Sequence, residues 1–287
     1  MKTVLSAEQA ETFARNGVLV ISDFFDVEKD IHPILRGIYQ LIGKVMERHH
    51  IPDQRPLFSP DIFDAGYQEL IALNRAYGAE VYDAVKQIPA FIRLVAHPLL
   101  EQLFLKIRPG SVPGIASGGS GIRIDNPFEE NFRAPWHQEY PAQLRSIDGL
   151  VFWSPLLPVS PELGPVKFCL GSHKSGVIPV YTRDPQNPEK QGAYALTLRN
   201  EAELISKYEK VAPCPSPGDL VVLDWLVLHA SGKNTTNRSR WTLQLRYFNF
   251  ADPVGMKHGW KGSYAMGVNF RDIHPELCAD SDIENKP

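Results

Sequence analysis

Cysteine is scarce in this chain of 287 residues. Only Cys169, Cys214 and Cys278 are present, and no two of them form a CxxC pair. Three widely separated thiols provide neither a disulfide framework nor a zinc ribbon. Because structural disulfides persist mainly in oxidising compartments, we expect reduced cysteines in a cytoplasmic protein.

Long apolar runs and an excess of one charge sign are also missing. No apolar segment approaches the roughly 18 residues that a membrane-spanning helix needs, and residues 1–6 lack the apolar core of a signal peptide. Thirty basic and thirty-three acidic side chains give a net charge of −3. That balance offers no basic surface for nucleic acid or an anionic membrane, so we expect neither as a partner.

The first hundred residues are predicted to be mostly helical. Ser6 and Gln9 have the spacing of a capping box, and Gly17 fits the position after a helix end. Asp23 or Asp26 can begin the second helix. The expected helices are at about 7–16, 26–48, 66–87 and 89–95, with a short strand at 18–21.

From about residue 103 the pattern changes to short apolar or alternating runs separated by turn residues. The predicted strands are 103–107, 121–124, 149–153, 166–170, 220–223 and 241–250. This pattern is typical of an antiparallel β-sandwich or barrel. We therefore expect a mainly β fold, a jelly roll (double-stranded β-helix) buttressed by α-helices.

We expect the whole chain, 1–287, to form a single domain. It would comprise a helical buttress at about 1–100, the jelly-roll core at about 101–250 and a loop-rich tail at about 251–287. The glycine-rich tail could cover an opening or join two copies of the chain, so a homodimer is left open.

Two histidines and one carboxylate are the candidate metal ligands. His137 and Glu139 lie two residues apart, so on a strand both would face the same side. His229 follows an apolar run, and a jelly roll places distant strands opposite each other across its mouth. Two imidazoles and a carboxylate that leave open positions are the ligand set of mononuclear iron(II) oxygenases. Taken alone, His-x-Glu is a weak signal, and His229 has an alternative role as a buried core histidine.

Arg240 follows His229 by eleven residues (240 − 229) in an alternating segment. Its polar residues are Arg240, Thr242, Gln244 and Arg246, and its apolar residues are Trp241, Leu243, Leu245 and Tyr247. A strand with its polar face in solvent would show the same alternation. If that face lines the barrel, Arg240 can hold the carboxylate of a 2-oxoacid in a bidentate pair. Arg246 would lie about 20 Å away at roughly 3.4 Å per residue, too far to share that anion.

Several segments resemble the phytanoyl-CoA dioxygenase family of iron(II)- and 2-oxoglutarate-dependent oxygenases. They are the opening helix and strand at 5–21, the segment 164–174 with its Gly-Ser-His-Lys turn, and the block 218–240. The last is the most specific, because it fixes the spacing from histidine to arginine. The resemblance implies a hydroxylase that takes a small-molecule substrate and O2 and releases succinate and CO2.

The resemblance also assigns residues. His137, Glu139 and His229 would bind iron(II), and Arg240, helped by Ser231, would bind the far carboxylate of 2-oxoglutarate. Two further assignments come from position in the sequence. Tyr140, next to Glu139, could border the cosubstrate, and Arg123, on the strand before His137, could meet an anionic substrate.

Glu139 is where the chain departs from the family, which usually carries aspartate at this position. The ligand set also accepts zinc or manganese, which leaves open a redox-neutral isomerase or hydrolase, and oxygen consumption separates these two classes of enzyme. A third reading is a non-catalytic barrel that binds the metal and releases no succinate.

Overall fold

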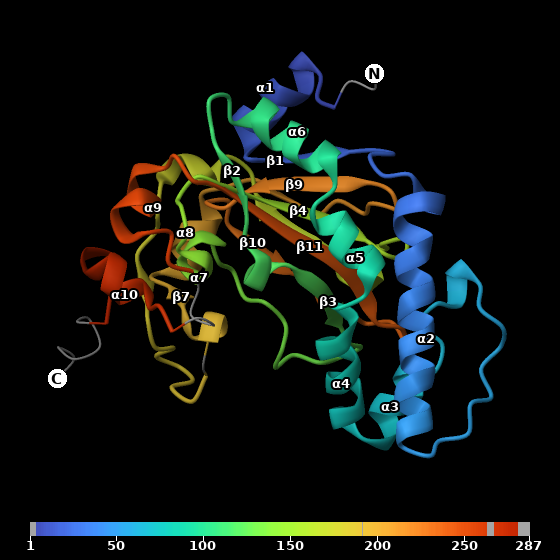
Figure 1. Cartoon of the computed structure of the whole chain (residues 1–287). Helices are drawn as coiled ribbons and strands as arrows, with labels where there is room; N and C mark the ends of the chain where they lie inside the picture. The colour runs from blue at the N-terminus through green and yellow to red at the C-terminus, as the bar shows by residue number, and fades with distance from the viewer. Residues whose placement is uncertain (1–3, 191, 263–266, 281–287) are drawn as a thin grey trace.

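A computed structural model describes residues 4–190, 192–262 and 267–280 (Figure 1). Its α-helices are α1 (Ala7–Asn16), α2 (His32–Arg48), α3 (Tyr67–Leu73), α4 (Arg75–Val85), α5 (Pro89–Val95), α6 (Pro98–Ile107), α7 (Tyr140–Gln143), α8 (Glu201–Ser206), α9 (Pro253–His258) and α10 (Phe270–Ile273). Its strands are β1 (Val18–Ile21), β2 (Pro113–Ile115), β3 (Gly121–Asp125), β4 (Gly149–Pro155), β5 (Val166–Cys169), β6 (Val180–Tyr181), β7 (Thr197–Leu198), β8 (Lys210–Val211), β9 (Leu220–Asp224), β10 (His229–Ser231) and β11 (Arg240–Asn249).

The strands pair antiparallel in three sheets. The largest has the order β1-β9-β4-β11-β2, and β3 pairs with β11 on the same edge as β2. A second sheet has the order β10-β5-β8, and β6 pairs with β7. In Figure 1 helices α2 to α5 stand to one side of the strands, whereas α9 and α10 lie on the other side.

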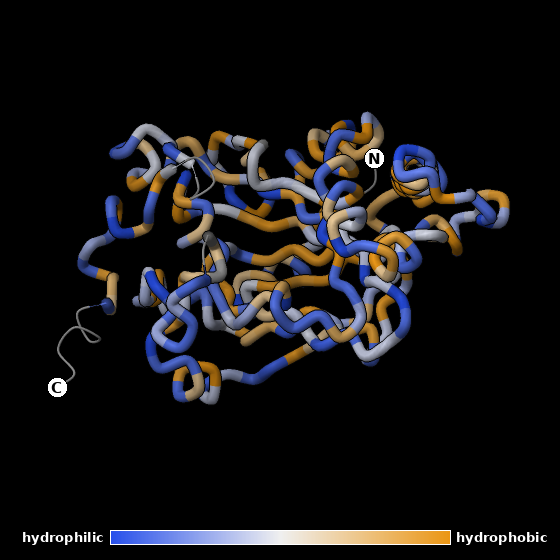
Figure 2. Tube along the Cα trace, turned by 90° about the horizontal axis from the view of Figure 1, so that it is seen from below, coloured by the Kyte–Doolittle hydropathy of each residue, from blue (hydrophilic) through white to orange (hydrophobic). Residues whose placement is uncertain are grey.

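Strand β4 in the large sheet is apolar on both faces because each face is covered. Leu150 and Phe152 of β4 belong to a core shared with the helices, whereas Val151 and Trp153 belong to a second core shared with the small sheet. Successive side chains of a strand point to opposite faces, so the large sheet lies between a helical layer and the small sheet. Figure 2 shows hydrophobic strand segments through the middle of the molecule.

The N-terminal predictions are confirmed in detail. Ser6 Oγ accepts a hydrogen bond from Gln9 N, and Gln9 Oε1 accepts one from Ser6 N, which completes the capping box. Helix α1 ends at Gly17, whose φ of 72° is left-handed. Asp26, rather than Asp23, begins the second helix by accepting from Lys29 N, through a π-helical turn, Val27–Ile31.

Two predicted elements differ from the structure. Residues 103–107 are the last turns of α6 and not a strand; His97 caps this helix, and Leu100, Leu103 and Phe104 bury one helical face. A five-residue apolar run fits either structure. The helix predicted at 66–87 is broken at Asn74, whose extended backbone lets its side chain cap α4.

Helices are more abundant than the sequence suggested, and the fold is mixed rather than mainly β. Helices occupy much of the chain as far as Ile107, and the tail also forms α9 and α10. Among the described residues no single helix is long and apolar enough to cross a membrane; only Arg75–Val85 and Pro89–Ile107 together, across a 54° bend, meet that test.

Candidate metal centre between two sheets

The two candidate histidines face each other across a backbone bridge. His137 N donates to His229 O and His229 N donates to His137 O, both at 3.0 Å. This double exchange holds the two residues directly opposite each other, with ring centroids 4.2 Å apart. Residues 92 positions apart in the sequence (229 − 137) are therefore neighbours.

In both imidazoles Nδ1 is hydrogen-bonded to the backbone, so Nε2 is the atom that can bind a metal. His137 Nδ1 lies 2.7 Å from Pro135 O, and His229 Nδ1 lies 2.9 Å from Val227 O. A carbonyl oxygen can only accept, so each Nδ1 carries the proton and each neutral ring presents a lone pair on Nε2. Such carbonyl partners are typical of metal-binding histidines.

Glu139 completes the set from a helical turn. Its backbone has φ −68° and ψ −37° immediately before α7, so the strand geometry expected for His137 and Glu139 is wrong. The chain leaves the bridge at His137 and turns, and Glu139 N donates to Trp225 O at 2.8 Å. Glu139 Oε2 then lies 3.8 Å from His229 Nε2, and ligand atoms of the three residues lie within 4.8 Å of one another.

The protonation states suit a metal. Burial and the adjacent His137 ring lower the pKa of His229 to about 3. Burial also lowers the pKa of His137, against the opposing effect of Glu139. Burial raises the pKa of the Glu139 carboxyl, but Arg246 and the two histidines outweigh it and bring the value to about 2. Near neutral pH the site therefore presents two neutral imidazoles and a carboxylate.

The three residues line a cavity of about 440 Å³ between the two sheets. Val151 and Trp153 of β4 contribute one wall, and Val166 and Phe168 of β5 contribute the opposite wall. The polar face of β11 points into this space through Gln244 and Arg246, while its apolar face packs in the helical core. The alternation in β11 therefore reflects a polar interior rather than a polar surface.

Arg240 is fully buried and is not among the residues that line the cavity. Its Nη2 donates to Asp125 Oδ2 at 2.8 Å and to Ser231 Oγ at 3.3 Å. Among the described residues its Nε and Nη1 have no hydrogen-bond partner, and neither has Thr242 Oγ1 on the same face of β11. Buried guanidinium donors are costly to leave unsatisfied, so this corner is suited to receive an anion.

The other predicted site residues have different surroundings. Ser231 and Arg123 line the cavity, and Arg123 is held by Asp125 and by Phe132 O. Burial raises the pKa of Asp125, but Arg123 and Arg240 together lower it to about 2. Tyr140 is packed outside the cavity lining, with its hydroxyl 2.8 Å from His274 Nε2, and makes no described contact toward the metal ligands.

Arg246 is a site residue that the sequence reasoning set aside. Its Nε lies 2.7 Å from Glu139 Oε1. Arg246 lies too far along β11 to share an anion with Arg240, and it has a charged partner of its own, Glu139, at its end of the same strand face. Gln143, which donates to the same Glu139 oxygen at 3.1 Å, carried no sequence signal at all.

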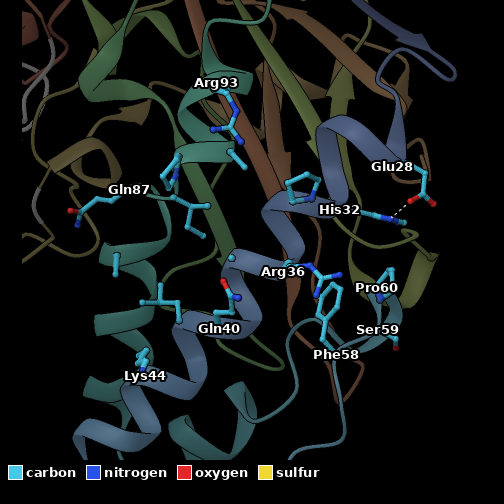
Figure 3. A pocket seen from close by; sticks show the side chains of 17 residues that line it. Glu28, His32, Arg36, Gln40, Lys44, Phe58, Ser59, Pro60, Gln87 and Arg93 are labelled. Carbon is cyan, nitrogen blue, oxygen red and sulfur yellow. Dashed lines mark hydrogen bonds and ion pairs between the residues drawn. The ribbon is translucent and has the colours of Figure 1, made fainter.

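A cavity of about 960 Å³ lies elsewhere, between α2, the loop at 58–60 and helices α4 and α5 (Figure 3). Arg36, Lys44 and Arg93 are at its rim, and His32 is paired with Glu28. Its size exceeds that of the cavity between the sheets, but it contains none of the clustered ligands. Chemistry rather than volume therefore identifies the functional site.

A cavity between antiparallel sheets, with two histidines and one carboxylate on its wall, has the ligand set of the two-histidine, one-carboxylate metal proteins. The chain belongs to the phytanoyl-CoA dioxygenase (PhyH) family, whose family model matches residues 13–242. No curated protein is significantly similar to this chain in sequence.

Solved structures share the fold at low sequence identity. EctD from S. alaskensis, solved with 2-oxoglutarate and 5-hydroxyectoine, has a TM-score of 0.57 and 20% identity over 88% of this chain and 78% of that one. The α-ketoglutarate-dependent carbocyclase SnoK from nogalamycin biosynthesis has a TM-score of 0.54 and 17% identity, over 85% and 84% of the two chains. The epimerase SnoN, solved with Fe3+, α-ketoglutarate and nogalamycin RO, has a TM-score of 0.53 and 15% identity, over 84% of this chain and 82% of that one.

Proposed function

We propose that this chain is an iron(II)- and 2-oxoglutarate-dependent dioxygenase that hydroxylates a small molecule with O2 and releases succinate and CO2. The observation that carries the proposal is the convergence of His137, Glu139 and His229 on one cavity. Membership of the phytanoyl-CoA dioxygenase family supports it. The similar structures that contain iron or 2-oxoglutarate support the same cofactor and cosubstrate.

The residues present fit both groups. Two neutral Nε2 atoms and one carboxylate oxygen are ligands that iron(II) accepts on one face, with the opposite face open. Nε and Nη1 of Arg240 have no partner among the described residues and lie on different edges of the guanidinium, so an oxygen of a carboxylate can accept from either. Thr242 Oγ1 can add a further hydrogen bond. A dicarboxylate that reached from the metal to Arg240 would satisfy one of these buried guanidinium donors.

Each protein group then has a task that follows from its contacts. Arg240 would bind the far carboxylate of 2-oxoglutarate, Ser231 would orient the Arg240 guanidinium, and the apolar walls would exclude water. Bound iron supplies the activation of O2 that is coupled to oxidative decarboxylation of the 2-oxoacid. A cavity of about 440 Å³ lies in the usual range for small-molecule sites. A charged substrate could meet Arg123 at its wall.

The proposal includes the fold. The large sheet and the β10-β5-β8 sheet face each other across the cavity, and we propose that together they form the double-stranded β-helix, with residues 1–287 as one oxygenase domain. The helices share their core with the large sheet, which supports this interpretation.

Succinate formation tests the function without knowledge of the substrate. Iron(II)-loaded protein incubated with 2-oxoglutarate and O2 should release succinate slowly, and the release should be lost in His137→Ala and with zinc in place of iron. An iron-loaded protein that consumes neither O2 nor 2-oxoglutarate, while binding small molecules in the cavity, would favour the redox-neutral or the non-catalytic alternative.

A further inference from the structure

Arg246 uses its whole guanidinium group inside the site. Nε donates to Glu139 Oε1 at 2.7 Å, Nη2 donates to Gln244 Oε1 at 3.0 Å, and Nη1 donates to the carbonyl of Gly119. Its side chain is only 12% exposed. Arg246 therefore links the candidate metal ligand to the glycine-rich loop that lines the same cavity.

The two oxygens of Glu139 have different surroundings. Oε1 accepts from both Arg246 Nε and Gln143 Nε2, whereas Oε2 faces His229 Nε2. Gly119 lies so close that an added Cβ would be 2.5 Å from Gln143 Oε1 and 3.2 Å from Arg246 Cδ. The loop, the arginine and the glutamine therefore form a packed clamp around Oε1.

Glutamate needs such a clamp more than aspartate would. Its additional methylene adds a rotatable bond, which lets the carboxylate turn both oxygens toward one metal. Two histidines and one carboxylate oxygen leave three of six positions open. A 2-oxoacid takes two of these and O2 takes the third, so a second oxygen from Glu139 would occupy a position that the reaction needs.

We propose that Arg246 is a positioning residue that, together with Gln143, restricts Glu139 to a single metal-binding oxygen and so keeps three coordination positions open. This inference rests on the proposed function for the identity of the ligands that fill those positions. It also accounts for the use of glutamate, because an aspartate at 139 would be about one methylene short of the clamp.

Counting the waters on a bound Mn(II) ion tests this directly. The relaxation rate of solvent protons reports exchangeable waters, and manganese suits carboxylate and water ligands. Wild type should hold three waters on the metal, and Arg246→Met should hold two, so its relaxation enhancement should fall by about a third. The affinity for 2-oxoglutarate should fall roughly tenfold, the factor that corresponds to about 1.4 kcal/mol, while the affinity for Mn(II) does not fall.

Matched variants separate positioning from a general loss of structure. Arg238→Met removes a comparable ion pair with Asp64, at 2.7 Å and outside the cavity lining, and should change neither water count nor 2-oxoglutarate affinity. Arg246→Lys keeps one donor for Oε1 and should retain three waters. If Arg246→Met does not fold, Gln143→Leu removes the other donor to Oε1 and should lower 2-oxoglutarate affinity in the same direction.

The decisive comparison uses Glu139→Asp. In that background Arg246→Met should leave the water count unchanged, because the shorter side chain no longer reaches the clamp. The proposal is overturned if Arg246→Met retains three waters and wild-type 2-oxoglutarate affinity, or if its effect is the same in both backgrounds. Should wild-type protein bind Mn(II) but never bind 2-oxoglutarate, the proposed function fails, and the water counts still decide the role of Arg246.

Discussion

Replacing Arg240 by methionine should weaken the binding of 2-oxoglutarate and leave metal binding in place. The side chain is fully buried, and only Nη2 has partners among the described residues, Asp125 and Ser231. Arg123 also pairs with Asp125 and remains in the variant. The metal ligands are untouched, so metal binding should persist and the loss should fall on the far carboxylate of the cosubstrate.

The magnitude follows from one hydrogen bond, because Nε and Nη1, which have no partner among the described residues, point from different edges of the guanidinium and cannot both reach one carboxylate. A hydrogen bond to a charged group contributes about 1.5–3 kcal/mol. At 1.4 kcal/mol for each factor of ten, the Kd for 2-oxoglutarate should rise by roughly tenfold to a hundredfold. Anaerobic calorimetric titration of the iron(II) protein measures this directly.

Pyruvate is the matched control ligand for this variant. It keeps the 2-oxoacid end but lacks the far carboxylate, so wild type and Arg240→Met should bind it with similar affinity. Arg238→Met serves as the control for removal of a paired arginine outside the cavity lining. An Arg240→Met variant that binds 2-oxoglutarate within about threefold of wild type, well under the tenfold of 1.4 kcal/mol, would refute the assignment of Arg240.

Two further predictions concern stability and the support of the site. Because the pKa of His229 is about 3 in the folded protein and 6.5 for an ordinary histidine, the unfolded chain binds more protons between these values. The free energy of unfolding of metal-free protein should therefore fall as pH drops from 6.5 toward 3, and urea titrations should show a smaller fall in His229→Gln. At Gly149 an added Cβ would lie 2.2 Å from the ring of Trp225, and the carbonyl oxygen of Trp225 accepts a hydrogen bond from Glu139 N. Gly149→Ala should therefore lower the free energy of unfolding by roughly 1–3 kcal/mol and weaken metal binding. Gly121→Ala, where an added Cβ meets open space, should retain the stability and the metal affinity of wild type. A Gly149→Ala protein as stable as wild type would contradict the close packing of Gly149 against Trp225.

The fold could be predicted where local chemistry decides it. Ser6 and Gln9 form the capping box that their spacing indicates, and β3, β4, β5, β9 and β11 lie within a few residues of the predicted strands. The apolar run at 103–107 was misassigned because five residues fit a strand or a buried helix equally well. Tertiary packing of Leu103 and Phe104 decided for the helix.

The candidate site, like the fold, could be predicted only in part. His137, Glu139 and His229 could be selected by residue type and spacing, and the structure brings them together. The way they meet could not be predicted, because it depends on a single bridge between His137 and His229 and on the helical turn at Glu139. Gln143 and Arg246 were missed because their role exists only once that turn places Glu139 Oε1 between them.

The measurement that tests the central claim most directly is an anaerobic titration of the iron(II)-loaded protein with 2-oxoglutarate, followed by visible absorption. Chelation of the metal by a 2-oxoacid produces a weak charge-transfer band. We expect a saturable band in wild type that is absent in His137→Ala and needs far more 2-oxoglutarate in Arg240→Met. Protein that demonstrably holds iron at this site and shows no band at any concentration of 2-oxoglutarate would contradict the central claim.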